Sequence, residues 1–141
     1  MKVAVLVCVI LTLFQVSCRR LNYVAEDFIC MKKLGIEESY LNDRVGDNFL
    51  LTTGDDQFND FVVCWVKEMG LVDENMQIIP SELKSYILKH QFNLFKKNDY
   101  PNKDEVAERV SKSCLNTEPG KNDGDTMVNI FNCVMTQMGA L

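Results

Sequence analysis

The cysteines constrain the fold of this 141-residue chain more than any other feature of its sequence. Two of the six, Cys8 and Cys18, lie in an apolar N-terminal segment. The other four are widely spaced over the rest of the chain, at Cys30, Cys64, Cys114 and Cys133. Four such cysteines either form two disulfides in an oxidising compartment or bind a metal ion, so the nature of the N-terminal segment bears directly on how they are used.

Residues 1–18 have the layout of a secretory signal peptide. Lys2 provides a basic start, residues 3–14 form an almost unbroken apolar run, and Val16 and Cys18 precede a cleavage site after Cys18. The run is shorter than the roughly 20 residues of a transmembrane helix. We therefore predict a secreted, extracellular protein that is not inserted in a membrane after cleavage, with residues 19–141 as one domain. A buried N-terminal helix is the alternative.

The four remaining cysteines can form two disulfides with three possible pairings. A zinc site is the alternative use, but these cysteines include no C-x2-C pair, and His90 is the only histidine. We predict two disulfides, each of which stabilises the fold by roughly 2–4 kcal/mol. No metal site and no cofactor is predicted.

The chain is acidic, with 15 basic and 20 acidic residues and a net charge of −5. Loss of Lys2 with the leader makes the balance 14 against 20, or −6. An acidic chain without a stripe of Lys and Arg is unsuited to nucleic acids and to anionic membrane surfaces. We therefore predict no nucleic-acid partner.

Apolar residues recur at the spacing of an α-helix in two long segments. Asp55 or Asp56 can cap the first segment, and Asp123 or Asp125 can cap the second. Both apolar stripes follow the offsets i, i+3, i+4, i+7 and i+11, which place the side chains on one helix face. The stripes consist of Phe58, Phe61, Val62, Trp65 and Met69, and of Met127, Ile130, Phe131, Val134 and Met138.

Further helices are predicted over residues 22–34, 37–45, 81–95 and 102–115. Gly35 suits the end of the first, Pro80 the start of the third, and Asn102-x-x-Glu105 resembles a capping box at the start of the fourth. The link over residues 45–53 is either a helical turn or a buried loop. The sequence thus predicts an all-α fold, a single compact domain of about six helices with two disulfides.

The sequence offers no catalytic constellation. With one histidine, a Ser-His-Asp or Cys-His arrangement has a single possible base, and no Gly-x-Ser-x-Gly motif surrounds a serine. A secreted phospholipase would need an aspartate after its histidine, but Gln91 follows His90. We therefore predict no enzymatic activity and no catalytic residues.

The cysteine spacing, Cys30-x33-Cys64-x49-Cys114-x18-Cys133, resembles that of insect odorant-binding proteins, the pheromone and general odorant-binding family. That family has six cysteines: one in the first helix, a C-x3-C pair in the third, a fourth later, and a final C-x8-C pair. The four cysteines here match the first, third, fourth and sixth. The second and fifth, which bond to each other in the family, would fall at Asp60 and Gly124. Because both are absent together, the chain resembles the four-cysteine "minus-C" subgroup.

The resemblance implies the pairings Cys30–Cys64 and Cys114–Cys133. It also implies about six helices around an internal apolar cavity that carries odorants, pheromones or lipid-like molecules. A small apolar ligand is then the main partner, with an olfactory receptor as a second one, and the protein is a monomer or weak dimer. Without the middle disulfide, the region around Asp60 and Gly124 is expected to open more readily.

The wall of such a cavity is predicted from helix faces rather than from matched family positions. Filling a closed core is the simpler interpretation of any one of these side chains. Tyr86, Tyr100 and His90 are candidates for the polar groups that orient a ligand. The predicted wall consists of Phe58, Phe61, Trp65, Leu83, Tyr86, Ile87, His90, Met127, Ile130, Phe131 and Val134.

Two polar residues lie within apolar stretches. His90 stands seven residues after Leu83 on an apolar stripe, so we expect a neutral core histidine with one hydrogen bond; a pH switch is the alternative. Asp60 is expected to be exposed on the flank of its helix.

A second class of function stays open. The chain can be a secreted helical signalling or salivary protein that acts through its surface or binds biogenic amines. An amine site would need acidic side chains inside a pocket, and a closed core without a pocket near the ~300 Å³ lower bound of ligand sites would favour signalling.

Overall fold

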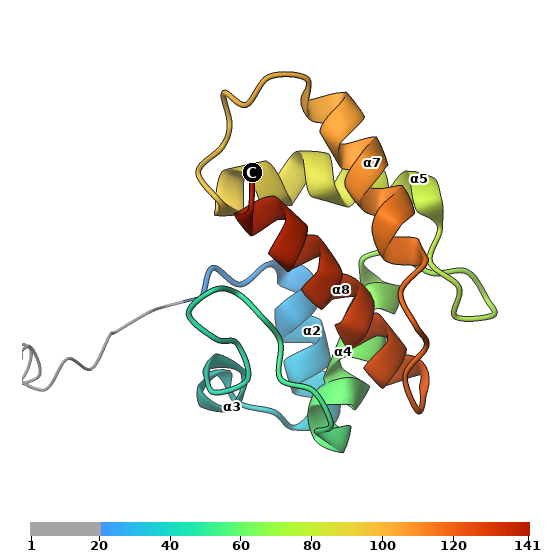
Figure 1. The fold of residues 1–141 in the computed structure, drawn as a ribbon. Helices are drawn as coiled ribbons and strands as arrows, with labels where there is room; N and C mark the ends of the chain where they lie inside the picture. The colour runs from blue at the N-terminus through green and yellow to red at the C-terminus, as the bar shows by residue number, and fades with distance from the viewer. Residues whose placement is uncertain (1–20) are drawn as a thin grey trace, which may run out of the picture.

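Six helices make up most of the part of the chain that the structure, a computed structural model, describes, residues 21–141 (Figure 1). The predicted signal peptide lies outside these residues. The all-α prediction is confirmed, and two isolated β-bridges, Val45–Leu51 and Val72–Ile78, are the strand-like pairings within the described range. The elements are α2 (Ala25–Leu34), α3 (Glu38–Asn42), α4 (Asp56–Glu68), α5 (Pro80–Tyr86), the π-helical segment η1 (Ile87–Gln91), α6 (Phe92–Leu94), α7 (Lys103–Leu115) and α8 (Asp123–Gly139). Elements α5, η1 and α6 follow one another without a break and form one helix.

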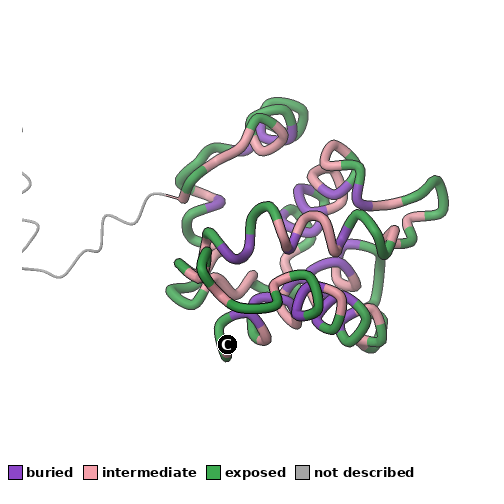
Figure 2. The backbone as a smooth tube through the Cα atoms, turned by 90° about the horizontal axis from the view of Figure 1, so that it is seen from above, coloured by how far each residue is buried: buried purple, intermediate pink, exposed green. Residues whose placement is uncertain are grey.

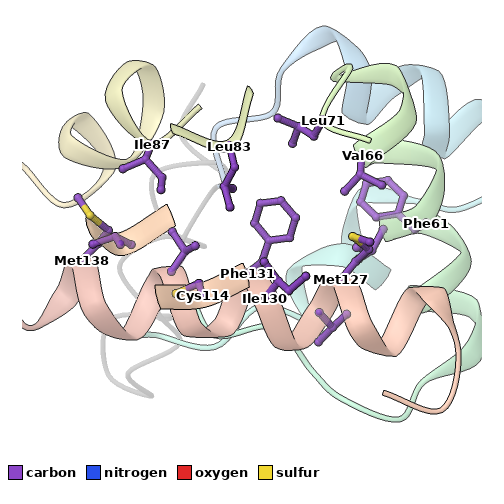
Figure 3. Packing of buried hydrophobic residues seen from close by; sticks show 14 of the residues in the cluster. Phe61, Val66, Leu71, Leu83, Ile87, Cys114, Met127, Ile130, Phe131 and Met138 are labelled. Atoms are coloured by element: carbon purple, nitrogen blue, oxygen red, sulfur yellow. The ribbon is translucent and has the colours of Figure 1, made fainter. Parts of the chain in front are cut away.

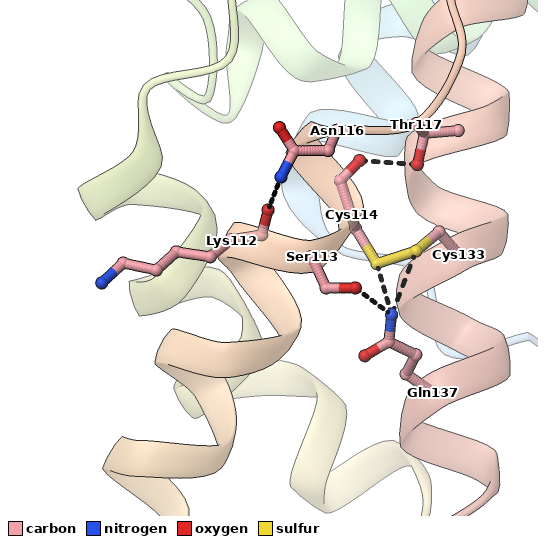
Figure 4. Close-up of a disulfide and its surroundings, with 7 residues drawn as sticks. All are labelled: Lys112, Ser113, Cys114, Asn116, Thr117, Cys133 and Gln137. Carbon is pink, nitrogen blue, oxygen red and sulfur yellow. Dashed lines mark hydrogen bonds between the residues drawn. A yellow bond between two sulfur atoms is a disulfide. The ribbon is translucent and has the colours of Figure 1, made fainter.

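The predicted disulfides are both present. Cys30–Cys64 ties α2 to α4, with 5.8 Å between the Cα atoms, and Cys114–Cys133 ties α7 to α8, with 5.5 Å. Beside the second disulfide, the Gln137 amide nitrogen donates to Ser113 Oγ at 2.9 Å and lies 3.4 and 3.5 Å from the two sulfur atoms (Figure 4). The pairing implied by the family resemblance is therefore confirmed.

The core lies along α8, which packs against α4 on one side and α7 on the other (Figure 1). Phe131, at the middle of α8, is 2% exposed and extends toward Leu83 and Leu71 (Figure 3). Figure 2 shows the same distribution along the backbone: buried residues gather where the helices face one another, and exposed residues follow the outer turns and loops. The amphipathic stripes of α4 and α8 thus form the core that their spacing predicts.

The helix ends follow local sequence only in part. Asp55 caps α4 by accepting from the Phe58 amide at 2.9 Å, and Gly35 ends α2 with a left-handed φ of 64°, as predicted. The α8 cap is Asn122, whose Oδ1 accepts from the Asp125 amide at 2.9 Å. The prediction of Asp123 or Asp125 there is wrong, because both already belong to the first turn of the helix.

The predicted capping box before α7 is also wrong. Asn102 adopts a left-handed conformation, φ 54°, and its side chain makes no capping hydrogen bond. A side-chain cap needs an extended backbone at that position. The sequence pattern was present, but the preceding turn sets a different backbone geometry.

The link that the sequence left undecided, residues 45–53, is a half-buried loop held to α8 by one side chain. Asn132 accepts from the Leu51 amide at 2.7 Å and donates to the Leu51 carbonyl at 2.9 Å. Phe49 in this loop has a positive φ of 63° and packs its ring against Phe95, with 5.4 Å between the ring centroids. The loop is therefore positioned both by the Val45–Leu51 bridge within it and by its contacts with Asn132 and Phe95.

Asp55 also joins the α3 region to α4. Its carboxylate accepts from Tyr40 Oη at 2.7 Å and from Arg44 Nε at 2.6 Å, in addition to the Phe58 amide. The Tyr40 hydroxyl, the Phe58 amide and Arg44 lower the pKa of Asp55 from 3.8 to about 2. A carboxyl whose pKa is depressed in the folded state stabilises it above the unfolded pKa, and this stabilisation is lost as the pH falls toward the folded pKa.

Comparison of Asp55→Asn with the unaltered protein tests this network. Asparagine caps helices as well as aspartate does, so the substitution removes the charge and keeps the cap. We expect the unaltered protein to be the more stable at pH 7, and the difference in unfolding free energy to shrink between about pH 4 and pH 2. Urea unfolding followed by circular dichroism at a series of pH values measures it. An equal difference at pH 7 and pH 2 would contradict the assigned role.

Helices α4 and α8 are in close contact at Gly124. A Cβ added there would lie 2.4 Å from Asn59 Cβ and 2.9 Å from Asn59 Cα, too close for any real contact. Next to this crossing, Asn59 Nδ2 donates to Asp125 Oδ1 at 2.7 Å. Glycine at this position is therefore what lets the two helices pack.

We expect Gly124→Ala to force α4 and α8 apart and to lower the unfolding free energy by about 1–3 kcal/mol, the usual cost of overpacking. Gly139→Ala is the matched control in the same helix, because a Cβ there would lie 3.4 Å from the Phe95 ring, near ordinary contact distance. Thermal unfolding of both variants measures the effect. Equal melting temperatures for the two would show that the crossing tolerates a methyl group.

Candidate functional site

Three aromatic side chains meet where α4, α5 and α8 converge. Trp65 of α4 packs edge-on against Phe131 of α8, with 5.3 Å between the ring centroids, and against Tyr86 of α5, with 5.6 Å. Tyr86 and Phe131 complete the triangle at 5.7 Å, also edge-on. Each ring thus contacts the other two, and together they join three helices by aromatic contacts of a favourable geometry. We call these three residues the aromatic cluster.

Most of the predicted wall residues are brought together in one core, the inner face of which is visible in Figure 3. Trp65 and Tyr86 are partly buried and pack against this core, whereas His90 is exposed. The role of the predicted residues as a ligand-binding wall stays a prediction, because side chains that fill a closed core are buried in the same way. The buried members are Phe58, Phe61, Leu83, Ile87, Met127, Ile130, Phe131 and Val134.

The prediction of a core histidine is wrong. His90 lies at the surface with its ring 5.2 Å from that of Tyr86, and Gln91 occupies the buried position instead, at 1% exposed. The reason is η1: a π-helical turn contains more residues than an α-helical turn, so the inward-facing position moves one residue further along the chain. The prediction had assumed a regular α-helix through this segment.

Gln91 places a polar group inside the apolar core. Its Nε2 donates to the Tyr86 hydroxyl oxygen at 2.9 Å. Its Oε1 is buried and has no hydrogen-bond partner among the described residues. Sequence reasoning missed Gln91 because glutamine is usually exposed, although its place four residues after Ile87 and eight after Leu83 is on the apolar helix face.

The surroundings of Tyr86 are apolar but not neutral. Burial raises the pKa of the Tyr86 phenol, and the negative charge of Asp27 on α2 adds to the shift. Burial also raises the pKa of the Asp27 carboxyl, an effect that a 2.7 Å hydrogen bond from the Val24 amide opposes. Tyr100, another residue predicted to orient a ligand, packs its ring against that of Phe92, with 6.3 Å between the ring centroids. The polar groups at the cluster are thus Tyr86 and Gln91, with Asp27 as the neighbouring charge.

Two surface hollows lie next to these elements. A small one of about 60 Å³ adjoins Tyr86 and His90 and is lined by Met69, Leu71, Glu82, Ser85, Tyr86, Lys89 and His90. A larger one of about 350 Å³ lies at the first turns of α4 and α8 and is lined by Asp56, Asn59, Asp60, Val63, Asn122, Asp123 and Gly124.

The larger hollow is polar, and it brings together the two positions at which the family resemblance places the missing cysteines, Asp60 and Gly124. Asp60 is exposed, as expected. Asn59, which precedes Asp60 in the chain, is the residue that packs against Gly124. Its Oδ1 is buried without a partner among the described residues.

Residues 21–141 contain no group of three or more His, Cys, Asp or Glu side chains that could hold a metal ion. Within the same range, every helix falls short of the length or the hydrophobicity needed to cross a membrane.

These features define a small all-helical domain with two interhelical disulfides and an aromatic, largely apolar core. Residues 26–137 match the model of the PBP/GOBP family, and the chain belongs to this family. Among solved structures, the chain is similar in fold to odorant-binding protein dmelOBP28a from Drosophila melanogaster, with a TM-score of 0.61 and 16% sequence identity, over 82% of this chain and 88% of that one. No match was found among curated proteins.

The Tyr86–Gln91 hydrogen bond can be tested by stability. Tyr86→Phe removes the acceptor of Gln91 Nε2 and leaves the buried amide with no partner, so we expect a loss of about 1–3 kcal/mol in unfolding free energy. Tyr100→Phe is the matched control, because Tyr100 is likewise a partly buried tyrosine and Gln91 donates to Tyr86 rather than to it. Urea unfolding of both variants decides: equal stabilities would mean that the buried amide does not depend on Tyr86.

Proposed function

We propose that this protein is a secreted carrier that binds small hydrophobic molecules non-covalently, with no catalytic step. The observation that carries the proposal is membership of the PBP/GOBP family, whose members are carrier proteins. The aromatic cluster is the proposed place of binding, because its rings and the surrounding aliphatic residues offer apolar surface between three helices. Odorants, pheromones and lipid-like molecules are the ligand classes proposed.

The driving force is transfer of the ligand out of water, worth about 25 cal/mol per Å² of apolar surface buried. Loss of ligand freedom offsets part of this gain, so a dissociation constant in the micromolar range is expected. The hollow beside Tyr86 holds about 60 Å³, well below the roughly 300 Å³ of common ligand sites. By this measure the closed core favours the surface-acting alternative, and the carrier function requires that the ligand enters by displacing core side chains, so that the cavity forms as it binds.

A four-cysteine framework supports this opening. Two disulfides hold α2 to α4 and α7 to α8, whereas α4 and α8 meet at Gly124 without a covalent link. We propose that the chain belongs to the minus-C subgroup and that α4 and α8 separate more easily than they would with a third disulfide. An olfactory receptor is the proposed recipient of the loaded carrier.

Displacement of a fluorescent probe tests the proposal. The oxidised protein, residues 19–141, is titrated with N-phenyl-1-naphthylamine, and fatty acids, terpenoids and aromatics then compete for the site. Trp65, the only tryptophan, lies in the aromatic cluster and reports on the same event through its own emission. We expect saturable micromolar binding, displacement by apolar molecules and a change in Trp65 emission. A folded protein with both disulfides that binds none of them would overturn the carrier function.

The larger hollow favours a second candidate function, binding of amines. Three carboxylates, Asp56, Asp60 and Asp123, line it, together with Asn59, whose buried Oδ1 is an acceptor without a partner among the described residues. An ammonium group is the complementary donor. Calorimetry with tyramine tests this: binding that Asp60→Asn removes and Asp43→Asn, an exposed control, leaves intact would favour the amine site. Absence of tyramine binding would exclude it.

A further inference from the structure

The buried acceptor at Gln91 suggests which apolar molecules the carrier prefers. Gln91 is 1% exposed, and its Nε2 is engaged by Tyr86 at 2.9 Å. This bond orients the amide, so that Oε1 is left in the core with no partner among the described residues. A buried carbonyl without a donor is costly, and such groups in native proteins are generally satisfied by something.

The backbone provides an independent observation at the same place. The π-helical turn η1, which contains Gln91, interrupts an otherwise regular helix between α5 and α6. π-Turns within helices are rare and occur frequently at functional sites. Here the turn lies next to the core directly: within it, Gln91 is buried and His90 is exposed.

From these two observations we infer that Gln91 Oε1 accepts a hydrogen bond from the bound ligand, and that the carrier selects apolar molecules that carry a hydroxyl group over ethers and hydrocarbons of the same size. The inference rests on the proposed function, since it names the ligand class of that site. An alcohol supplies the missing donor to Oε1, whereas an ether or an alkane leaves this acceptor unsatisfied. Selectivity of this kind is strong because the free protein already bears the cost of the unsatisfied Oε1, and only a ligand with a donor removes that cost.

The test uses three ligands with equal numbers of heavy atoms: 1-nonanol, methyl octyl ether and decane. Each competes with N-phenyl-1-naphthylamine on the unaltered protein and on Gln91→Met. Methionine is unbranched and close to glutamine in size, but it has no amide. Gln137→Met is the matched control, because Gln137 also donates a side-chain hydrogen bond, to Ser113, but lies at the disulfide between α7 and α8.

We expect the unaltered protein and Gln137→Met to bind 1-nonanol more tightly than the ether. In Gln91→Met this preference should fall by about 3- to 10-fold, the range expected from loss of one hydrogen bond. Affinity for decane should change little or rise. Comparing preferences between proteins cancels the different hydration of the two ligands.

A measurement on the unaltered protein covers the case in which Gln91→Met does not fold. The side-chain amide resonances of Gln91 in a ¹⁵N spectrum should shift on addition of 1-nonanol more than on addition of decane. Two outcomes would overturn the inference and leave the carrier function standing. In the first, Gln91→Met prefers 1-nonanol over the ether as strongly as the unaltered protein does. In the second, the unaltered protein prefers the ether and Gln91→Met loses that preference. If no ligand displaces the probe from any of the proteins, the carrier function itself fails.

Discussion

The packing of α8 against α4 is the interaction on which the rest of the structure depends. It sets the depth of Phe131 in the core and brings that ring to Trp65. At the other end of the contact, Gly124 lets the backbones approach so closely that no other residue fits without movement. The helix from Pro80 packs against α7 and closes the aromatic cluster with Tyr86. A change in the separation of α4 and α8 therefore alters the cluster directly.

The two disulfides limit which movements the fold allows. One fixes α2 to α4 and the other fixes α7 to α8, so the helices are tied in two pairs. The contact between the pairs is non-covalent: Asn59 and Asp125 share one hydrogen bond beside Gly124. The covalent links therefore restrain each pair, whereas the contact between α4 and α8, the most extensive one between helices in the described residues, is held by packing and by this hydrogen bond.

Local patterns predicted most of the fold, and two of the failures share a cause. The stripes of α4 and α8, the cap at Asp55 and the stop at Gly35 follow from short-range spacing, and the structure agrees with them. Asn102 and His90 failed because their backbones depart from the geometry that the pattern assumed, a left-handed residue in one case and a π-turn in the other. The π-turn has no signature in the residues nearby, whereas asparagine is among the residues that adopt the left-handed conformation most readily. Gln91 was missed because glutamine is usually exposed, although its spacing from Leu83 and Ile87 places it on their helix face.

The central claim is that a small apolar ligand lies among Trp65, Tyr86 and Phe131. A crystal structure of the protein soaked with 1-bromononane tests this most directly, because anomalous scattering locates the bromine atom without ambiguity. We expect a bromine peak within the core, with the alkyl chain against the three rings and the α4–α8 contact widened. A peak confined to the polar hollow at Asp60 and Gly124, or a core unchanged at saturating ligand, would contradict it.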